Sequence, residues 1–214
     1  MKVTIIDYGL SNLLSVQHAF AHFGAETLLT SKPEDVLAAD ALVLPGVGAF
    51  QDGMAGLEKL GLVEPIRQKA AAGTPLLGIC LGMQMLFDES EEFGLHKGLG
   101  LIPGRVVKIP DTDADGCPQR VPHISWNPLY PGGSRADFGG TVLAVQPGEE
   151  CYFIHSYEAK PTDETDCLAF TVYGGRRICA AATHGSVLGC QFHPEKSGEV
   201  GLKIIEEFMK SADR

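Results

Sequence analysis

The chain has 214 residues, a length that corresponds to one domain, and 44% of them are apolar. A chain of this length buries about 70% of its unfolded surface, which suffices for a core without disulfide bonds. The 17 Lys and Arg against 27 Asp and Glu give a net charge of −10, which argues against a nucleic-acid-binding protein because phosphate contacts need clustered cations. The apolar fraction excludes a disordered chain, and no apolar run approaches the ~18 residues that span a bilayer. We predict a single domain over residues 1–214.

The cysteine spacing and the first residues indicate a cytoplasmic protein. The six cysteines show no short paired spacing of the kind that binds zinc, and free thiols are typical of a reducing compartment. The N-terminal sequence MKVTIIDYGL has Asp7 where a secretory signal peptide is still apolar. We expect no metal site and no cofactor. The cysteines are Cys80, Cys117, Cys151, Cys167, Cys179 and Cys190.

Strand and helix patterns alternate through the first half of the chain. Continuous apolar runs predict strands at residues 3–7, 26–30, 41–45 and 75–80. Helical spacing of apolar residues predicts a first helix that Ser11 caps and Gly24 ends. Further helices are expected after Pro33, at 51–59, at 62–72 and directly after residue 80. Continuous apolar strands separated by helices are typical of a parallel sheet covered on both faces.

The pattern changes after about residue 98, where Pro and Gly separate short strand-like runs. These runs predict an antiparallel extension packed beside the parallel sheet. Segments 111–120 and 130–140 have the composition of surface loops, and apolar residues along one side of 200–210 predict a final helix. The predicted strands lie near residues 99–109, 141–145, 151–157, 167–173, 178–183 and 187–192.

One cysteine lies between an apolar strand and a helix, in the sequence Gly78-Ile79-Cys80-Leu81-Gly82. Small neighbours allow a sharp strand-to-helix turn that lifts one side chain out of the sheet edge, toward a helix N-terminus whose dipole favours a thiolate. The pattern therefore predicts Cys80 as a nucleophile. The alternative is an ordinary buried cysteine beside a helix-starting glycine.

A thiolate nucleophile needs a base within hydrogen-bond reach and a third group that holds the base. His193 follows the apolar run VLGCQF, and Pro194 forces a turn. Glu195, two positions on, could reach back to the imidazole. Alone, this triplet also fits a strand-end histidine beside a surface glutamate; together with the cysteine elbow it indicates a catalytic triad.

Acyl transfer also needs hydrogen-bond donors for a developing oxyanion. Gly46-Val47-Gly48 follows the strand at 41–45, at a carboxyl end of the predicted parallel sheet, where glycine-rich backbone can present N–H groups. The two glycines could instead simply make a turn. Dinucleotide binding is disfavoured, because neither this turn nor DYGLSN at the first strand has the three-glycine fingerprint.

Several motifs together resemble a known family. GICLGMQ around Cys80 and the triplet HPE resemble the class I (triad) glutamine amidotransferases, whose domain is about the size of this chain. DYG followed by Asn12-Leu13, LPGVGAF, PHISWN, YFIHSY and HPEKS resemble, within that family, the glutaminase subunits of imidazole glycerol phosphate synthase. The resemblance implies a flavodoxin-like α/β fold with a central, mainly parallel sheet flanked by helices and an antiparallel extension in the C-terminal half.

The same resemblance implies a thioester mechanism. Cys80 would attack the side-chain amide of glutamine, His193 would pass the thiol proton to departing ammonia, and Glu195 would orient His193. Water would then release glutamate. The oxyanion would lie on backbone N–H groups around Gly46, Val47 and Leu81. Contacts to glutamine would come from Gln84, Glu92, Ser156 and Tyr157.

The resemblance also implies a partner, a (β/α)₈-barrel cyclase in a heterodimer. The cyclase would use the ammonia and a phosphoribulosyl nucleotide to make imidazole glycerol phosphate and AICAR in histidine biosynthesis. His123 and His155 would have structural roles. One departure from the family pattern is Ile124-Ser125, where Met-Gly is usual, and it bears on local geometry rather than on the triad. The expected interface residues are Asn12, Trp126, Tyr152 and Lys196.

Three alternatives stay open at this point. Another class I amidotransferase would share the triad but deliver ammonia to a different acceptor, and the partner encoded nearby would identify it. A free-standing cysteine hydrolase would share the sheet, although LGMQ and HPE suit glutamine better than a peptide. A flavodoxin-like binding module would lack a reactive Cys80, and iodoacetamide labelling would distinguish it.

Overall fold

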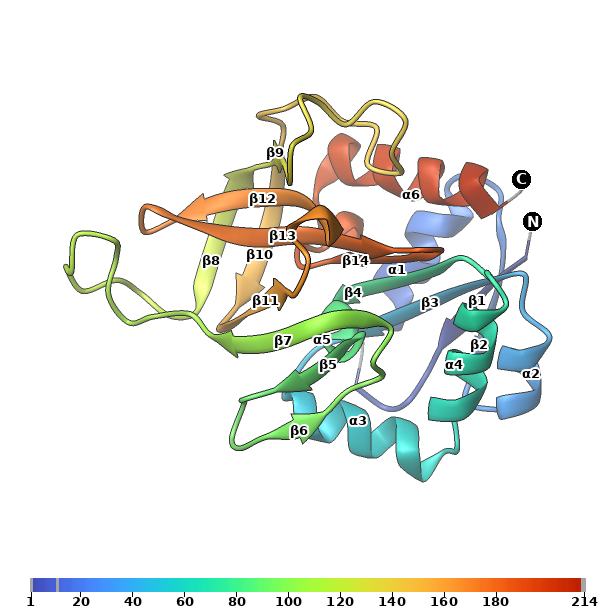
Figure 1. Cartoon of the computed structure of the whole chain (residues 1–214). Helices are drawn as coiled ribbons and strands as arrows, with labels where there is room; N and C mark the ends of the chain where they lie inside the picture. Colours follow the sequence, from blue (N-terminus) through green and yellow to red (C-terminus); the bar gives the residue numbers. More distant parts are fainter. Residues whose placement is uncertain (1, 11, 213–214) are drawn as a thin grey trace.

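An eight-stranded sheet forms the centre of the computed structural model, which describes residues 2–10 and 12–212. The strand order is β2-β1-β3-β4-β14-β13-β12-β9 (Figure 1). The first five of these strands are parallel: β2 (Glu26–Thr30), β1 (Lys2–Ile6), β3 (Ala41–Gly46), β4 (Leu76–Cys80) and β14 (Val187–Cys190). An antiparallel extension follows: β13 (Arg176–His184), β12 (Cys167–Tyr173) and β9 (Tyr130–Pro131). The predicted fold class is confirmed.

Helices cover both faces of this sheet (Figure 1). The apolar cluster on one face includes side chains of α1 (Leu13–Ala21) and α6 (Gly198–Ala212). The cluster on the other face includes α2 (Pro33–Leu37), α3 (Phe50–Lys59), α4 (Val63–Ala71) and α5 (Leu81–Met85). Every residue of β3 and β4 is buried, as the continuous apolar runs predicted for strands covered on both faces. No helix in the described part of the chain is long and apolar enough to cross a membrane.

Two smaller sheets lie beside the central one. β8 (His123–Pro128) pairs antiparallel with β10 (Glu150–His155). The other sheet has the order β11-β7-β5-β6, with β11 (Tyr157–Pro161), β7 (Ile102–Lys108), β5 (Phe87–Ser90) and β6 (His96–Lys97). Because β10 and β11 belong to different sheets, the chain turns between them at Ser156. The single strand predicted at 151–157 is therefore two strands.

Several local predictions were wrong. The predicted strand at 141–145 is a series of turns; its Leu143 and Val145 are apolar because they pack into the core with α6, not because they pair. The predicted loop at 130–140 contains the short strand β9, and β5, β6 and β8 were not predicted. The helix after Cys80 has only five residues. Ser11, predicted as the first helix cap, lies outside the described residues.

Candidate active site

The turn between β4 and α5 is possible only with the glycines that the sequence supplies. A Cβ on Gly82 would lie 1.8 Å from the carbonyl oxygen of Leu44, and a Cβ on Gly78 would lie 2.8 Å from the carbonyl oxygen of Gly82. Cys80 itself has a φ of 55°, which L-residues rarely adopt and which marks a sharp, strained turn. The strand-to-helix geometry thus places Cys80 at the carboxyl end of a central strand and at the N-terminus of α5.

His193 and Glu195 form the hydrogen-bonded pair that the spacing predicted. Nδ1 of His193 lies 2.8 Å from Oε1 of Glu195, and their side chains are 3% and 2% exposed. Pro194 begins the short 3-10 helix η2 (Pro194–Lys196) and turns the chain back, which brings the carboxylate to the ring. The His193 backbone is fixed on both sides, because its N–H donates to Tyr152 and its carbonyl accepts from the Ser197 hydroxyl.

The imidazole of His193 interacts with Cys80 on its other side. Burial lowers the pKa of His193, but the nearby Cys80 sulfur, the hydrogen bond to Glu195 and the negative charges of both partners outweigh burial and raise the pKa to about 9. Within residues 2–10 and 12–212, Nε2 of His193 forms no hydrogen bond that meets the geometric criteria, so its bond to the sulfur is not closed in this conformation. His193 therefore lies beside both Cys80 and Glu195, where the ring can hold a proton near the sulfur.

A cavity of about 290 Å³ opens at this point. It gathers residues from the elbow, the glycine loop, the turn at Ser156 and the segment after β5, which are far apart in the sequence. Predicted site residues that line it are Val47, Cys80, Leu81, Gln84, Glu92, Ser156, Tyr157 and His193. Glu195 lies behind His193, and Gly46 is buried at the end of β3. The cavity is also lined by Gly48, Pro122, Ile154 and His155, which were not predicted to line it.

Gln84 is tied to a second glutamine that the sequence interpretation missed. Nε2 of Gln84 donates to the carbonyl of Tyr157 and to Oε1 of Gln191, both at 3.0 Å. Nε2 of Gln191 in turn lies 3.8 Å from Sγ of Cys80. The Gln84 amide hydrogens are thus occupied, which leaves Oε1 for a ligand. The signal for Gln191 that the sequence offered was a polar residue inside the apolar run VLGCQF. In the structure Gln191 is fully buried.

Glu92 connects the cavity to the glycine loop. Its Oε2 accepts a hydrogen bond from the N–H of Phe50, at 2.6 Å. Phe50 is the first residue of α3, and this contact satisfies one of the N–H groups that a helix start leaves without a partner. The carboxylate also carries negative charge near the positive end of the helix. Glu92 therefore anchors the C-terminal end of the segment Gly46–Ala49.

The predicted oxyanion donors differ in how they are oriented. The N–H of Val47 donates to the carbonyl of Leu10 at 3.0 Å, so in this conformation it is not available to a substrate. The assignment of Val47 to the oxyanion hole stays a prediction that requires this peptide to rotate. Leu81 is the first residue of α5, and helix geometry leaves its N–H without an intrahelical partner. Gly46 packs against Tyr8, whose hydroxyl would lie 2.2 Å from a Cβ at position 46.

Two of the predicted interface residues, Trp126 and Tyr152, belong to an apolar patch. β8 and β10 turn one face toward solvent, and we call it the β8–β10 outer face: the exposed Ile124, Trp126 and Ile154 and the half-buried Tyr152. Trp126 is 50% exposed, and its ring centroid lies 6.0 Å from that of Tyr152. Ile124, one of the two residues that depart from the family pattern, belongs to this face, whereas Ser125 points inward to His123. Asn12 and Lys196 are exposed as well.

Within residues 2–10 and 12–212, no group of three or more His, Cys, Asp or Glu side chains could hold a metal ion. A buried thiol at a helix N-terminus, a carboxylate-bound imidazole and an adjacent cavity constitute the arrangement that acyl transfer through a thioester requires.

The chain is similar to known glutamine amidotransferases over almost its whole length. Residues 4–212 match the family model Glutamine amidotransferase class-I. The chain is 51% identical over 210 residues to imidazole glycerol phosphate synthase subunit HisH 1 of Legionella pneumophila (strain Lens), covering 98% of this chain and 99% of the relative. It is 44% identical over 209 residues to the HisH subunit of Lactococcus lactis subsp. lactis (strain IL1403), covering 98% of both.

Solved structures show the same fold at low sequence identity. A crystal structure of a glutamine amidotransferase superposes with a TM-score of 0.74 at 20% identity and covers 99% of both chains. The PurLQS structure from Thermotoga maritima superposes with a TM-score of 0.72 at 18% identity and covers 98% of both chains. At this identity the likeness concerns the fold alone.

Proposed function

The chain belongs to the class-I glutamine amidotransferase family, and we propose that it is the glutaminase subunit of an imidazole glycerol phosphate synthase. It hydrolyses glutamine to glutamate and ammonia, and the ammonia serves histidine biosynthesis. The observation that carries this function is the line Cys80–His193–Glu195 at the mouth of a cavity, in a chain 51% identical to a HisH subunit over almost its whole length.

The triad performs two successive acyl transfers. Because the pKa of His193 is about 9, the ring holds a proton at neutral pH while the Cys80 sulfur is the nucleophile. The sulfur attacks the side-chain carbonyl carbon of glutamine, the C–N bond breaks, and His193 gives its proton to the departing ammonia. The neutral ring then takes a proton from water, whose oxygen attacks the thioester and releases glutamate. Glu195 keeps the ring oriented throughout.

Two backbone donors stabilise the oxyanion in this scheme. One would be the N–H of Leu81, at the start of α5. The N–H of Val47 must first leave the carbonyl of Leu10 and turn toward Cys80. The glycines at 46 and 48 allow such a rotation, because a residue without a Cβ takes up both backbone conformations at low cost. Gly46 thus supplies flexibility, and its neighbouring peptide supplies the donor.

The substrate is held at the far side of the same cavity. Glu92 supplies a carboxylate for the α-ammonium group of glutamine, and the backbone of Ser156 and Tyr157 lines the wall. Gln84 offers its free amide oxygen. These residues surround a volume of about 290 Å³, which accommodates an amino acid of this size.

The partner is the cyclase subunit, in a heterodimer that docks on the β8–β10 outer face. Exposed Trp and Tyr side chains are enriched at the centres of protein interfaces, and Trp126 and Tyr152 lie side by side here. Ile154 lines the cavity and is also 38% exposed on the outer face. Ammonia released at Cys80 therefore has a short route to this face. Lys196 and Asn12, which are both exposed, would form the rim of this interface.

The whole chain forms one catalytic domain in this proposal, because the family match spans residues 4–212 and both apolar clusters share the central sheet. We also propose that the enzyme acts in the cytoplasm, which cell fractionation tests. The decisive experiment is co-purification with the cyclase, followed by glutamate release from glutamine with and without the cyclase and its nucleotide ligand. Failure to release glutamate under any of these conditions would contradict the function.

A further inference from the structure

We propose that His123 and His155 are a pair of positioning residues that fixes the wall of the glutamine cavity, with Ser125 as the outer end of their hydrogen-bond chain. The proposal rests on the proposed glutaminase function. His155 lines the cavity, whereas His123 lies one layer further from it. The two residues are 6% and 0% exposed.

Each step of this chain is a contact of hydrogen-bond length. Nδ1 of His155 lies 2.8 Å from the carbonyl oxygen of Tyr157. Nε2 of His155 lies 3.0 Å from Nδ1 of His123, and Nε2 of His123 lies 3.0 Å from Oγ of Ser125. The side-chain oxygen Oδ1 of Asn127 lies 2.9 Å from the same Nε2 atom. The chain thus runs from β8, beside the outer face, to the cavity wall.

The chemistry of the inner end group fixes the protonation of His155. A carbonyl oxygen only accepts, so Nδ1 of His155 carries the proton and donates to Tyr157. In a neutral ring Nε2 of His155 then carries no proton, and it faces Nδ1 of His123. At the outer end the Ser125 hydroxyl donates to Oδ1 of Asn127, and both of these atoms contact Nε2 of His123. Burial, which lowers the pKa of His123 and lowers that of His155 to about 3, keeps both rings neutral.

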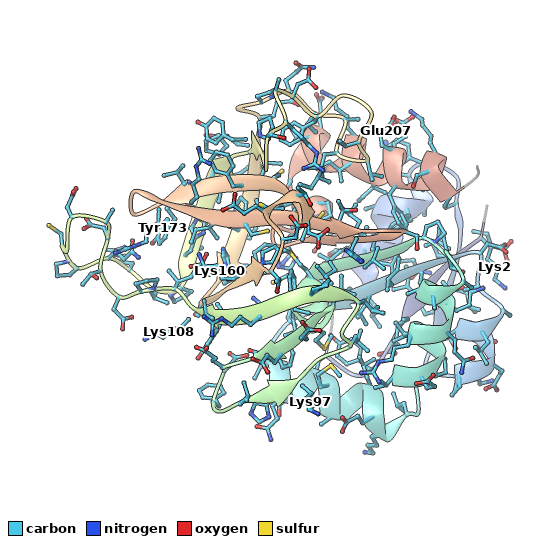
Figure 2. All side chains as sticks on the ribbon, in the orientation of Figure 1. Lys2, Lys97, Lys108, Lys160, Tyr173 and Glu207 are labelled. Carbon is cyan, nitrogen blue, oxygen red and sulfur yellow. The ribbon has the colours of Figure 1, made fainter. Side chains whose placement is uncertain are left out.

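Aromatic packing holds the first ring of the pair in place. The ring of His123 stacks on Tyr173, with centroids 4.0 Å apart and planes 23° apart, and on Phe153, with centroids 5.1 Å apart. Figure 2 shows Tyr173 where β12 and β13 reach the side of the molecule that carries β8. A ring held between two aromatic faces cannot rotate out of its hydrogen bonds without losing this packing.

The pair acts on a carbonyl that the substrate wall shares. The oxygen of Tyr157 accepts from His155 and also from Nε2 of Gln84, at 3.0 Å. Gln84 continues to Gln191, whose Nε2 lies 3.8 Å from the Cys80 sulfur. The turn at Ser156 between β10 and β11 is therefore held by the N–H of His155, which takes no part in the reaction. Without this hydrogen bond the cavity wall is free to shift relative to Cys80.

The test compares two substitutions of His155 in the complex with the cyclase. His155→Leu removes the donor, whereas His155→Asn keeps an N–H near the position of Nδ1. We expect His155→Leu to raise the KM for glutamine by about tenfold or more with a smaller change in kcat, since small misplacements of a binding wall are costly. We expect His155→Asn to recover most of the loss. Ammonia-dependent synthesis by the same complexes is expected to stay unchanged.

The control is His184→Leu. His184 is the last residue of β13, where it pairs with Val187. This variant is expected to have the kcat and the KM of the wild type. An unchanged KM in His155→Leu would overturn the proposal, as would equal losses in the Leu and Asn variants. Loss of ammonia-dependent synthesis in His155→Leu would also overturn it, because the pair would then support folding or docking generally. A wild-type complex without glutaminase activity would instead refute the proposed function.

Discussion

The N–H of Val47 donates to the carbonyl of Leu10 at 3.0 Å, across the gap between the end of β3 and the segment after β1. The same peptide would have to rotate for its N–H to reach an oxyanion on Cys80. The pair His193–Glu195 is formed, whereas the N–H of Val47 points away from Cys80. In the mechanism proposed above, this conformation has a complete proton-transfer pair and lacks one oxyanion donor.

We expect the purified chain alone to hydrolyse glutamine slowly. A missing oxyanion donor costs about 10² to 10³ in rate, so docking of the cyclase and its nucleotide ligand should raise kcat by a factor within this range if they turn the Val47 peptide. The measurement is steady-state glutamate release by the chain alone, with cyclase, and with cyclase plus ligand. Equal rates in all three conditions would show that the loop is not limiting.

Cys80→Ala should abolish glutamine hydrolysis, because no other group replaces the sulfur that forms the thioester. Ammonia-dependent synthesis by the complex should survive, since the fold and the outer face are unaffected. Cys190→Ala is the control, because Cys190 is buried in β14 two residues before Phe192 and faces the core. Glutamate release and product formation from added ammonia are measured side by side. Undiminished glutaminase activity in Cys80→Ala would refute the triad.

Local sequence signals brought out the three predicted triad residues but not their surroundings. Cys80 ends β4, and His193 follows β14, the parallel strand that pairs with β4 in the structure. Glu195 reaches back to His193 over one proline, a contact that the spacing in the sequence predicts. Gln191 and His155 lie within apolar runs, and their roles depend on which face of a strand meets which loop. The peptide orientation at Val47 depends on a backbone contact to Leu10, and no side-chain pattern encodes such a contact.

The predictions of secondary structure were likewise correct where the local pattern decides the structure and wrong where tertiary packing decides it. Runs such as 41–45 and 75–80 are apolar throughout because both faces are covered, and both predictions were correct. The run at 141–145 is apolar for another reason, since Leu143 and Val145 fill the core from a loop. β8 alternates between buried and exposed residues over an outer face that itself carries large apolar side chains, so its pattern does not separate inside from outside.

The pH dependence of the reaction should report His193. The pKa of an unperturbed histidine is ~6.5, whereas the surroundings of His193 raise its pKa to about 9. The departing ammonia needs the ring proton, so kcat/KM should fall as pH rises through about 9. Glu195→Gln removes one cause of the raised pKa. We expect a slower enzyme in which kcat/KM falls at a pH about one unit lower than in wild type. If the pH of this fall does not change, the fall reports another group.

Folding stability should fall on the acid side because of the buried histidines. Burial lowers the pKa of His155 to about 3, below the ~6.5 of the unfolded chain. Between these values the unfolded chain binds a proton that the folded one does not, so this contribution is full above pH 6.5 and declines as pH falls. His193 has the opposite sign, because its raised pKa adds stability below pH 6.5 that is lost through pH 9. Urea midpoints at pH 7 and pH 5 should therefore differ less in His155→Asn than in wild type; an equal difference would contradict the assignment.

Tyr8→Phe should stabilise the isolated chain. The buried Tyr8 hydroxyl has no hydrogen-bond partner among residues 2–10 and 12–212, and burial together with the charge of Cys80 raises the pKa of Tyr8. A buried, unsatisfied hydroxyl costs about 1–3 kcal/mol, so its removal should raise the free energy of unfolding by up to that amount. Gly46→Ala should destabilise strongly, because the new Cβ would lie 2.2 Å from the same hydroxyl, and less so in combination with Tyr8→Phe. Urea unfolding of the two single variants and the double variant measures this coupling. Additive effects, or a less stable Tyr8→Phe, would mean that the hydroxyl has a partner and that Gly46 is required for another reason.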